Sequence, residues 1–135
     1  MSDSFQLEIV TPEKVVVRDT ALEMQIPGKN GYLGILPGHA PLITELAVGE
    51  ISYRTLGSRH RLSVAWGFAE VLPEKVTILA ETCERPEEID IQRAREARQR
   101  ADERLKSGSS DVDYTRANNA LERAENRLAV AEKKS

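Results

Sequence analysis

The composition of the chain changes abruptly near Arg85. Every glycine except Gly108 and every proline except Pro86 lies before that point. Glycine and proline at short intervals favour short strands joined by turns, whereas a long stretch without them permits helices. The sequence therefore predicts two domains, residues 1–84 made of strands and residues 85–135 made of helices.

Several segments before Arg85 alternate apolar and polar residues, as half-buried strands do. In FQLEIV, Phe5, Leu7 and Ile9 fall on one face, and LEMQI and KVTILAE repeat the pattern. Breakers such as PGKNG separate the runs at intervals of about 8–12 residues. This spacing predicts an all-β sandwich or barrel.

The second region carries the pattern of two amphipathic helices. No glycine or proline interrupts residues 90–106, SGSS breaks the run, and Ser110 is the expected N-cap of a second helix. A short link between two such helices predicts an antiparallel hairpin. Because its apolar positions are mostly alanine, we expect close but weak packing. These positions are Ala94, Ala97, Ala101 and Leu105, then Ala117, Leu121, Ala124, Leu128 and Ala131.

Composition excludes several classes of function. A net charge of −3 and an aromatic content of 4% argue against nucleic-acid binding. The single cysteine, Cys83, and the absence of paired His or Cys spacings argue against a disulfide or a metal site. No serine or histidine lies in a catalytic motif, so we expect no catalysis. The N-terminal residues lack the pattern of a secretory signal, which favours a cytoplasmic protein.

The stretch GYLGILPGHAPLITEL, residues 31–46, has one acidic residue in a chain that is 30% charged. From its composition alone it is a catalytic loop, a core segment or a surface that another protein covers. Its histidine, His39, is expected to make local hydrogen bonds in a turn. Its apolar residues are expected to divide between the core and an exposed surface: Leu33, Ile35, Leu36, Leu42 and Ile43.

Arginines recur at helical spacing in the second region. Arg93 and Arg100 lie seven residues apart and so share a helix face, and Arg116, Arg123 and Arg127 line the second helix at steps of seven and four. Such arginines either form ordinary exposed ion pairs or present guanidinium groups to an anionic partner. The spacing does not decide between these alternatives.

The order of these features resembles the epsilon subunit of F-type ATP synthases. The strongest match is GYLGILPGHAPL, followed by WGFAEVLPEKVTILAE and by the helical segments IDIQRAREARQRADERL and RANNALERAENRL. The resemblance covers essentially the whole chain. Two positions depart from it: Tyr32 stands where members often carry a polar residue, and Trp66 stands where a second glycine is common, so the local strand packing is expected to differ.

The resemblance implies a β-sandwich of about ten strands followed by an antiparallel helical hairpin. It implies a non-catalytic rotor subunit of the central stalk that helps to couple proton flow to ATP synthesis. The hairpin would inhibit ATP hydrolysis when it extends. The implied partners are the gamma, alpha and beta subunits and the c-ring, at the cytoplasmic face of the bacterial plasma membrane and reaching the membrane only through the complex. The alternative is a free-standing scaffold with no rotary role.

The resemblance also implies site residues, with no catalytic residue, no metal and no required cofactor. ATP is a possible regulatory ligand, because IDIQRA matches a nucleotide-binding motif of some members. The implied nucleotide-binding residues are Glu84, Ile89, Asp90, Arg93, Ala94, Arg100 and Arg127. Those implied for an acidic segment of the beta subunit are Arg100, Arg104, Arg116, Arg123 and Arg127. Those implied for the gamma subunit and the c-ring are Tyr32, Leu36, His39 and Leu42.

Overall fold

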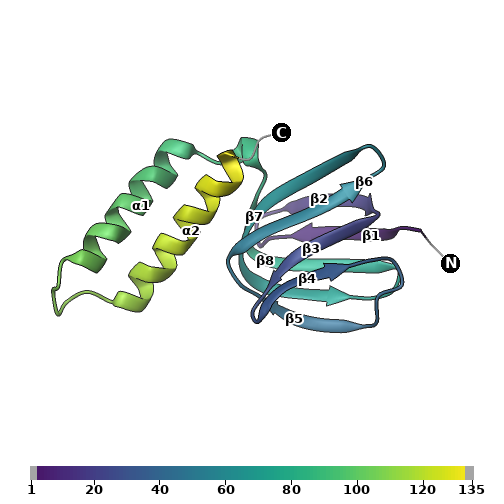
Figure 1. The fold of residues 1–135 in the computed structure, drawn as a ribbon, viewed down its shortest axis with the longest axis horizontal. Coiled ribbons are helices and arrows are strands. Elements are labelled where there is room, and N and C mark those ends of the chain that lie inside the picture. The colour runs from purple at the N-terminus through teal and green to yellow at the C-terminus, as the bar shows by residue number, and fades with distance from the viewer. Residues whose placement is uncertain (1–2, 133–135) are drawn as a thin grey trace. The chain divides into compact units, whose positions relative to one another are not determined.

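A computed structural model describes residues 3–132, and its contacts divide the chain into two compact units, Met1–Glu84 and Arg85–Ser135. The first unit consists of strands and the second of helices (Figure 1). The strands are β1 Phe5–Val10, β2 Val15–Ala21, β3 Glu23–Gly28, β4 Gly31–Ile35, β5 Leu42–Leu46, β6 Gly49–Thr55, β7 Ser58–Val71 and β8 Lys75–Glu84. The helical elements are the 3-10 turn Pro86–Glu88, α1 Ile91–Lys106 and α2 Tyr114–Glu132.

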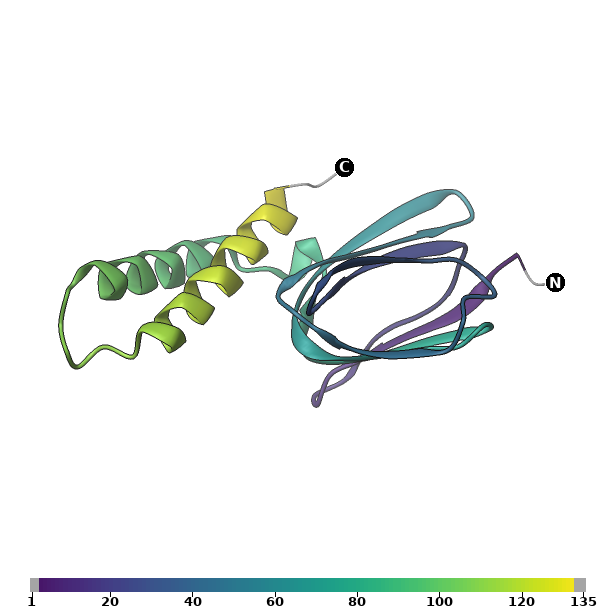
Figure 2. The same ribbon diagram turned by 60° about the horizontal axis from the view of Figure 1, so that its bottom comes forward.

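The strands form a sandwich of two layers (Figure 2). One layer contains β4, β3, β6 and the first half of β7, paired antiparallel. The other contains β2, β1, β8, the second half of β7 and β5, in which only β1 and β8 are parallel. The layers meet again where Gly28 of β3 pairs with Leu46 of β5. The predicted sandwich followed by a hairpin is therefore confirmed.

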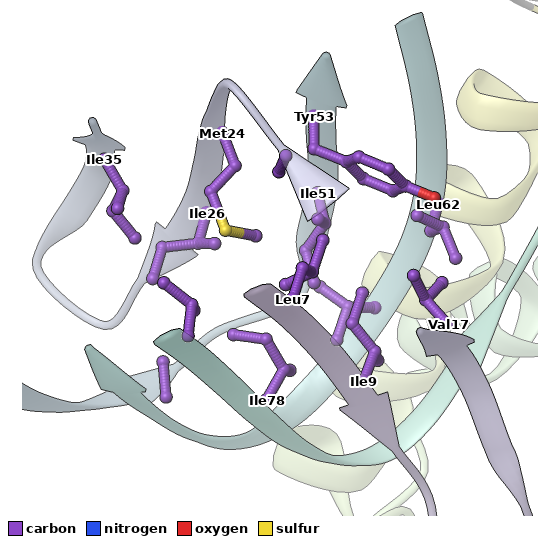
Figure 3. Packing of buried hydrophobic residues seen from close by; sticks show 14 of the residues in the cluster. Leu7, Ile9, Val17, Met24, Ile26, Ile35, Ile51, Tyr53, Leu62 and Ile78 are labelled. Carbon is purple, nitrogen blue, oxygen red and sulfur yellow. The ribbon is translucent and has the colours of Figure 1, made fainter. Parts of the chain in front are cut away.

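The core lies between the two layers, where alternate residues of each strand point inward (Figure 3). Ile9, Ile26, Ile51 and Ile78 are completely buried, so each layer contributes branched side chains to the same cluster. Tyr53 is buried with them, and its hydroxyl donates a hydrogen bond to a carboxylate oxygen of Asp19. A buried tyrosine needs such a partner, and the bond ties β6 to the edge strand β2.

Strand β7 passes from one layer to the other at Trp66 and Gly67. Both residues have positive φ, 55° for Trp66 and 130° for Gly67, in a region that glycine adopts most readily. The register with β8 is the same on both sides of the bend, since Ala65 pairs with Thr82 and Gly67 with Ala80. The strand bends at these two residues, so that the residues before them pair with β6 and those after them pair with β5.

The strand count is eight, lower than the approximately ten that the resemblance implied. The difference has a physical reason: β7 runs unbroken for 14 residues through both layers. The strand bends at Trp66 and Gly67 without ending, so one strand serves both layers.

The second unit is a hairpin of two helices that pack along their length (Figure 1). Asp90 caps α1 by accepting a hydrogen bond from the backbone N–H of Arg93 at 3.0 Å. The predicted N-cap of the second helix, Ser110, was wrong. Asp113 takes that role, because its carboxylate accepts from the N–H of Arg116 at 3.0 Å, and a carboxylate at this position also opposes the helix dipole.

The interface between the helices is formed largely by alanine, as the sequence predicted. Ala94 and Ala101 of α1 and Ala117 and Ala124 of α2 are each at most 3% exposed. Leu128 is the one buried leucine in the described helices. Each alanine buries about three fewer carbons than a leucine, at about 0.8 kcal/mol per methylene group, so the seam contributes little to stability for its length.

We expect Gly67→Ala to destabilise the sandwich strongly. An added Cβ would overlap the carbonyl oxygen of Leu79 on β8, and alanine is strained at this positive φ. The loss in the free energy of unfolding should be about 2–4 kcal/mol, measured by urea denaturation. Gly34→Ala is the matched control, because nothing lies within 4 Å of its added Cβ. Equal stabilities of the two variants would contradict the role given to Gly67.

Candidate functional site

The stretch of residues 31–46, with Glu45 as its one charged residue, forms β4, a turn and β5. Ile35 is buried, and Leu33 and Leu42 pack against the core from its edge. Leu36 and Ile43 are instead 60% and 71% exposed. The apolar residues therefore divide between core and surface, as the sequence predicted.

Tyr32 and His39 of this stretch make specific hydrogen bonds. The hydroxyl of Tyr32 accepts a bond from the backbone N–H of Glu50 at 3.0 Å, so the side chain reaches across β3 to β6. Gly49 leaves room for it, since a Cβ there would overlap that hydroxyl. His39 lies in the turn, where its ring Nδ1 is 2.7 Å from the carbonyl oxygen of Ala40. The backbone N–H of His39 donates a hydrogen bond to the carbonyl oxygen of Leu36. His39 is thus a turn histidine.

An exposed row of apolar side chains crosses the outer surface of the second layer. Phe68 of β7 pairs with Leu79 of β8, Leu79 with Val10 of β1, and Val10 with Val15 of β2. Phe68 and Leu79 are each more than half exposed. On β5, Glu45 lies opposite Phe68 and the exposed Ile43 lies diagonally from it, opposite Glu70. Contiguous exposed apolar side chains of this kind mark a contact surface for another protein. We call these five apolar residues the apolar row.

The sequence analysis missed four members of the apolar row. The available signal was in the alternation: in GFAEV, Ala69 and Val71 point inward, so Phe68 is an apolar residue at an outward position. Leu79 breaks the pattern of β8 in the same way. Only the strand register reveals that these positions are adjacent.

The outer surface of the first layer is polar instead. Glu23 of β3 forms ion pairs with Arg54 of β6 and Arg59 of β7, at 3.5 Å and 2.9 Å. The hydrogen bond from Arg59, with the nearby charge of Arg54, lowers the pKa of the Glu23 carboxyl. On the other layer, the bond from Arg18 lowers the pKa of Glu8 in the same way. The two surfaces of the sandwich therefore suit different neighbours.

The arginines of the hairpin gather on one flank of each helix. At 100° per residue, Arg93, Arg100 and Arg104 lie on the same side of α1, beside the alanine seam. Arg116, Arg123 and Arg127 hold the corresponding side of α2. Of these six, five are exposed and Arg127 is half-buried. On these flanks the described helices carry alanines between the arginines. We call the six residues the arginine face.

The antiparallel arrangement sets the arginines of the two helices level with one another. Ile89, just before α1, packs against Val130 and Ala131 near the end of α2, and Gln99 shares a groove with Leu121 midway. This register places three pairs along the face: Arg93 with Arg127, Arg100 with Arg123, and Arg104 with Arg116. The first two levels are about 10 Å apart along α1, at 1.5 Å per residue.

The opposite flank of the hairpin has mixed charge. A groove there is lined by Arg95 and Arg98 together with acidic residues, among them Asp102 and Glu125. Asp102 also forms an i,i+4 ion pair with Lys106 at 3.0 Å. The flank that carries the arginine face is therefore the basic one.

The residues implied for nucleotide binding fall into both units. Glu84 ends β8 of the sandwich, and the others belong to the hairpin. Asp90 is exposed but engaged as the helix cap, whereas Ile89 and Ala94 are buried within the hairpin. The positively charged members, Arg93, Arg100 and Arg127, all lie on the arginine face.

Two further features bear on the site. Among residues 3–132, no cluster of three His, Cys, Asp or Glu side chains is placed to hold a metal ion. Neither of the described helices combines the length and apolar character required to cross a membrane.

Two family models together match nearly the whole chain. The beta-sandwich domain of the ATP synthase Delta/Epsilon chain matches residues 4–86, and the long alpha-helix domain of that chain matches residues 87–132. The chain belongs to the ATP synthase Delta/Epsilon family.

Similar proteins agree with this assignment. The ATP synthase epsilon chain of Koribacter versatilis is 67% identical over 111 residues, covering 82% of this chain and 78% of that protein. The epsilon chain of Solibacter usitatus is 46% identical over 134 residues, covering 99% and 100%. A chain in the mitochondrial ATP synthase of Euglena gracilis, in a structure of OSCP, F1 and c-ring, has the same fold, with a TM-score of 0.83, 23% identity, and coverage of 96% and 82%.

Family membership confirms the main sequence-based predictions. The chain is an epsilon subunit of the F-type ATP synthase central stalk, and it is a non-catalytic subunit of that complex. It takes part in ATP synthesis as one component of the ATP synthase complex.

Proposed function

We propose that the helical hairpin regulates ATP hydrolysis by the complex through its arginine face. The single observation that carries this proposal is the gathering of six arginines on one flank of a hairpin whose seam is mostly alanine. Guanidinium groups at the same level repel one another, so the arginine face opposes closure of a weakly packed hairpin. An anion that binds between the helices would offset this repulsion and favour the closed state.

ATP is the first anion proposed for the arginine face. An arginine guanidinium group can donate two parallel hydrogen bonds to phosphate oxygens. Arg93 and Arg127, which lie at the same level, would bind the phosphates from both helices. The helix cap Asp90 would fix the start of α1 beside that pair. Binding at 100 times the Kd would stabilise the closed hairpin by about 2.7 kcal/mol, which is large against an alanine seam.

An acidic segment of the beta subunit is the anion proposed for the open hairpin. Opening exposes the alanine seam and frees both helices to lie along the stalk. Arg100, Arg104, Arg116, Arg123 and Arg127 would then form ion pairs with that segment and block rotation in the hydrolysis direction. Because the same arginines serve both anions, ATP and the beta subunit would compete.

We further propose that the sandwich attaches the subunit to the gamma subunit and the c-ring, at the cytoplasmic face of the plasma membrane. The apolar row supports attachment to gamma, because exposed aromatic and aliphatic side chains in adjacent strands supply the buried centre that an interface needs. The turn between β4 and β5 supports contact with the c-ring, because Leu36 is exposed at this turn and His39 and Leu42 lie beside it. The ring of Tyr32 is also exposed, although its hydroxyl is engaged by Glu50.

The nucleotide proposal predicts that Arg93→Ala weakens ATP binding by about tenfold or more, because a charge-assisted hydrogen bond contributes about 1.5–3 kcal/mol. Titration calorimetry of ATP against the full chain measures this, with ADP and GTP as further ligands. Arg95→Ala is the matched control, since Arg95 lies on the same helix but lines the groove of the opposite flank. Equal ATP affinity in the wild type and Arg93→Ala would overturn the proposed site.

The inhibition proposal predicts that the double variant Arg100→Gln, Arg123→Gln relieves inhibition. The concentration of chain that half-inhibits ATP hydrolysis by the alpha, beta and gamma subunits should rise roughly tenfold. Arg95→Gln, Arg98→Gln removes the same charge from the opposite flank and should leave inhibition unchanged. If both double variants inhibit alike, the arginine face does not carry regulation.

The attachment proposal predicts that the double variant Phe68→Ser, Leu79→Ser binds the gamma subunit at least about tenfold more weakly, because central apolar side chains dominate interface energy. Both side chains are exposed, so the thermal midpoint of the free chain should change little. Leu56→Ser is the control, since Leu56 is 91% exposed in the turn between β6 and β7. Unchanged binding of gamma by the double variant would contradict the role of the apolar row.

A further inference from the structure

The segment PGKNG forms a tight turn between β3 and β4, with Asn30 at its tip. Gly28 at the end of β3 pairs with Gly31 at the start of β4, so Lys29 and Asn30 alone make the turn. Gly31 has a φ of 130°, a conformation in which any other residue would be strained. The turn therefore requires glycine directly after Asn30, and Asn-Gly is a dipeptide typical of hairpin turns.

An asparagine followed by glycine is chemically labile when its surroundings leave it accessible. The backbone nitrogen of the next residue can attack the side-chain amide carbon, and glycine presents no side chain to hinder the approach. Asn30 and Gly31 are both exposed, and nothing lies within 4 Å of the position that a Cβ of Gly31 would take. Among residues 3–132, none forms a hydrogen bond with the side-chain amide of Asn30. At most one strand pair, Gly28 with Gly31 at the end of β4, has to open for the attack, and terminal pairs open most readily.

We propose that Asn30 is a site of spontaneous deamidation in the folded chain. The backbone nitrogen of Gly31 gives up its proton and forms a bond with Cγ of Asn30, while the bond from Cγ to the side-chain nitrogen breaks and ammonia leaves. The product is a cyclic imide. Water then opens the imide, at Cγ to give aspartate or at the main-chain carbonyl carbon to give isoaspartate. The reaction consumes water, releases ammonia and transfers no electrons.

Both products would change the interactions of the turn. The Nζ atom of Lys29 lies 3.2 Å from a carboxylate oxygen of Glu45, and its backbone N–H donates to the carbonyl oxygen of Glu45. A new carboxylate beside Lys29 would compete for that ammonium group. Isoaspartate would also lengthen the main chain within the turn, which shifts the start of β4. Tyr32 lies there, so its hydrogen bond with the N–H of Glu50 should weaken in the isoaspartate form.

Peptide mapping of the full chain tests the proposal. The folded chain is incubated in mildly alkaline buffer, sampled over days, and digested for mass spectrometry with separation of aspartate and isoaspartate peptides. The asparagines of α2, Asn118, Asn119 and Asn126, are internal controls, because each is followed by a residue with a side chain. Their helical N–H groups are also hydrogen-bonded, and losing such a bond costs about 1 kcal/mol. With the added hindrance, Asn30 should react at least about tenfold faster than any of the three.

Two results of this experiment would overturn the proposal. One is a rate at Asn30 no higher than the rates of the α2 asparagines. The other is deamidation of Asn30 that occurs only after the chain is unfolded in urea, because the folded turn would then protect it.

A variant isolates the effect on β4. Asn30→Gln keeps an amide but has to close a larger ring, so modification at this position should be at least about tenfold slower. After equal incubation, the backbone amide of Glu50 should exchange with deuterium about tenfold faster in the modified wild-type chain than in Asn30→Gln. Equal exchange at Glu50 in a chain shown to contain isoaspartate would contradict the proposed weakening of the Tyr32 bond. The test uses the chain alone, so its outcome does not depend on the proposed partners.

Discussion

The bend of β7 at Trp66 and Gly67 is the constraint on which the sandwich depends. Strand β7 serves both layers because its backbone turns at two consecutive residues with positive φ. The carbonyl of Leu79 occupies the space where a side chain at Gly67 would lie, so β8 can approach β7 closely at the bend. Tryptophan in the left-handed region costs about 1–2 kcal/mol, a strain that the surrounding pairing of β7 with three strands holds in place.

The same bend determines which residues become neighbours on the surface. After Gly67 the strand lies between β5 and β8, so Phe68 and Leu79 meet and extend the apolar row toward β1 and β2. Before Trp66 the strand lies beside β6, and its outward residues join the ion pairs of Glu23. An apolar outer surface and a charged one therefore arise from two halves of a single strand.

The stability of the closed hairpin depends instead on the balance between apolar packing at the seam and repulsion between arginines. The alanine seam allows the helices to approach closely but buries little apolar surface, and the arginine face adds repulsion at three levels. A structure held by small favourable contributions against a comparable unfavourable one responds to modest binding energies. The proposed control by anion binding acts on this repulsion directly.

Local patterns in the sequence determined the strand and helix segments, the position of the domain change near Arg85, the alanine seam and the repetition of arginines. Each of these depends on neighbours within one or two turns of helix or a few residues of strand, which the sequence displays directly. The N-cap at Asp113 was missed because Ser110, Asp111 and Asp113 are all residue types that cap helices. The conformation of the loop before α2 decides which of them lies at the first turn of the helix. Tertiary structure alone decided the apolar row, the continuity of β7 through both layers and the position of β4 at the edge of its layer. These depend on which strands pair and in what register, and pairing between residues such as Val10 and Leu79, far apart in the chain, is set by the closing of the whole core.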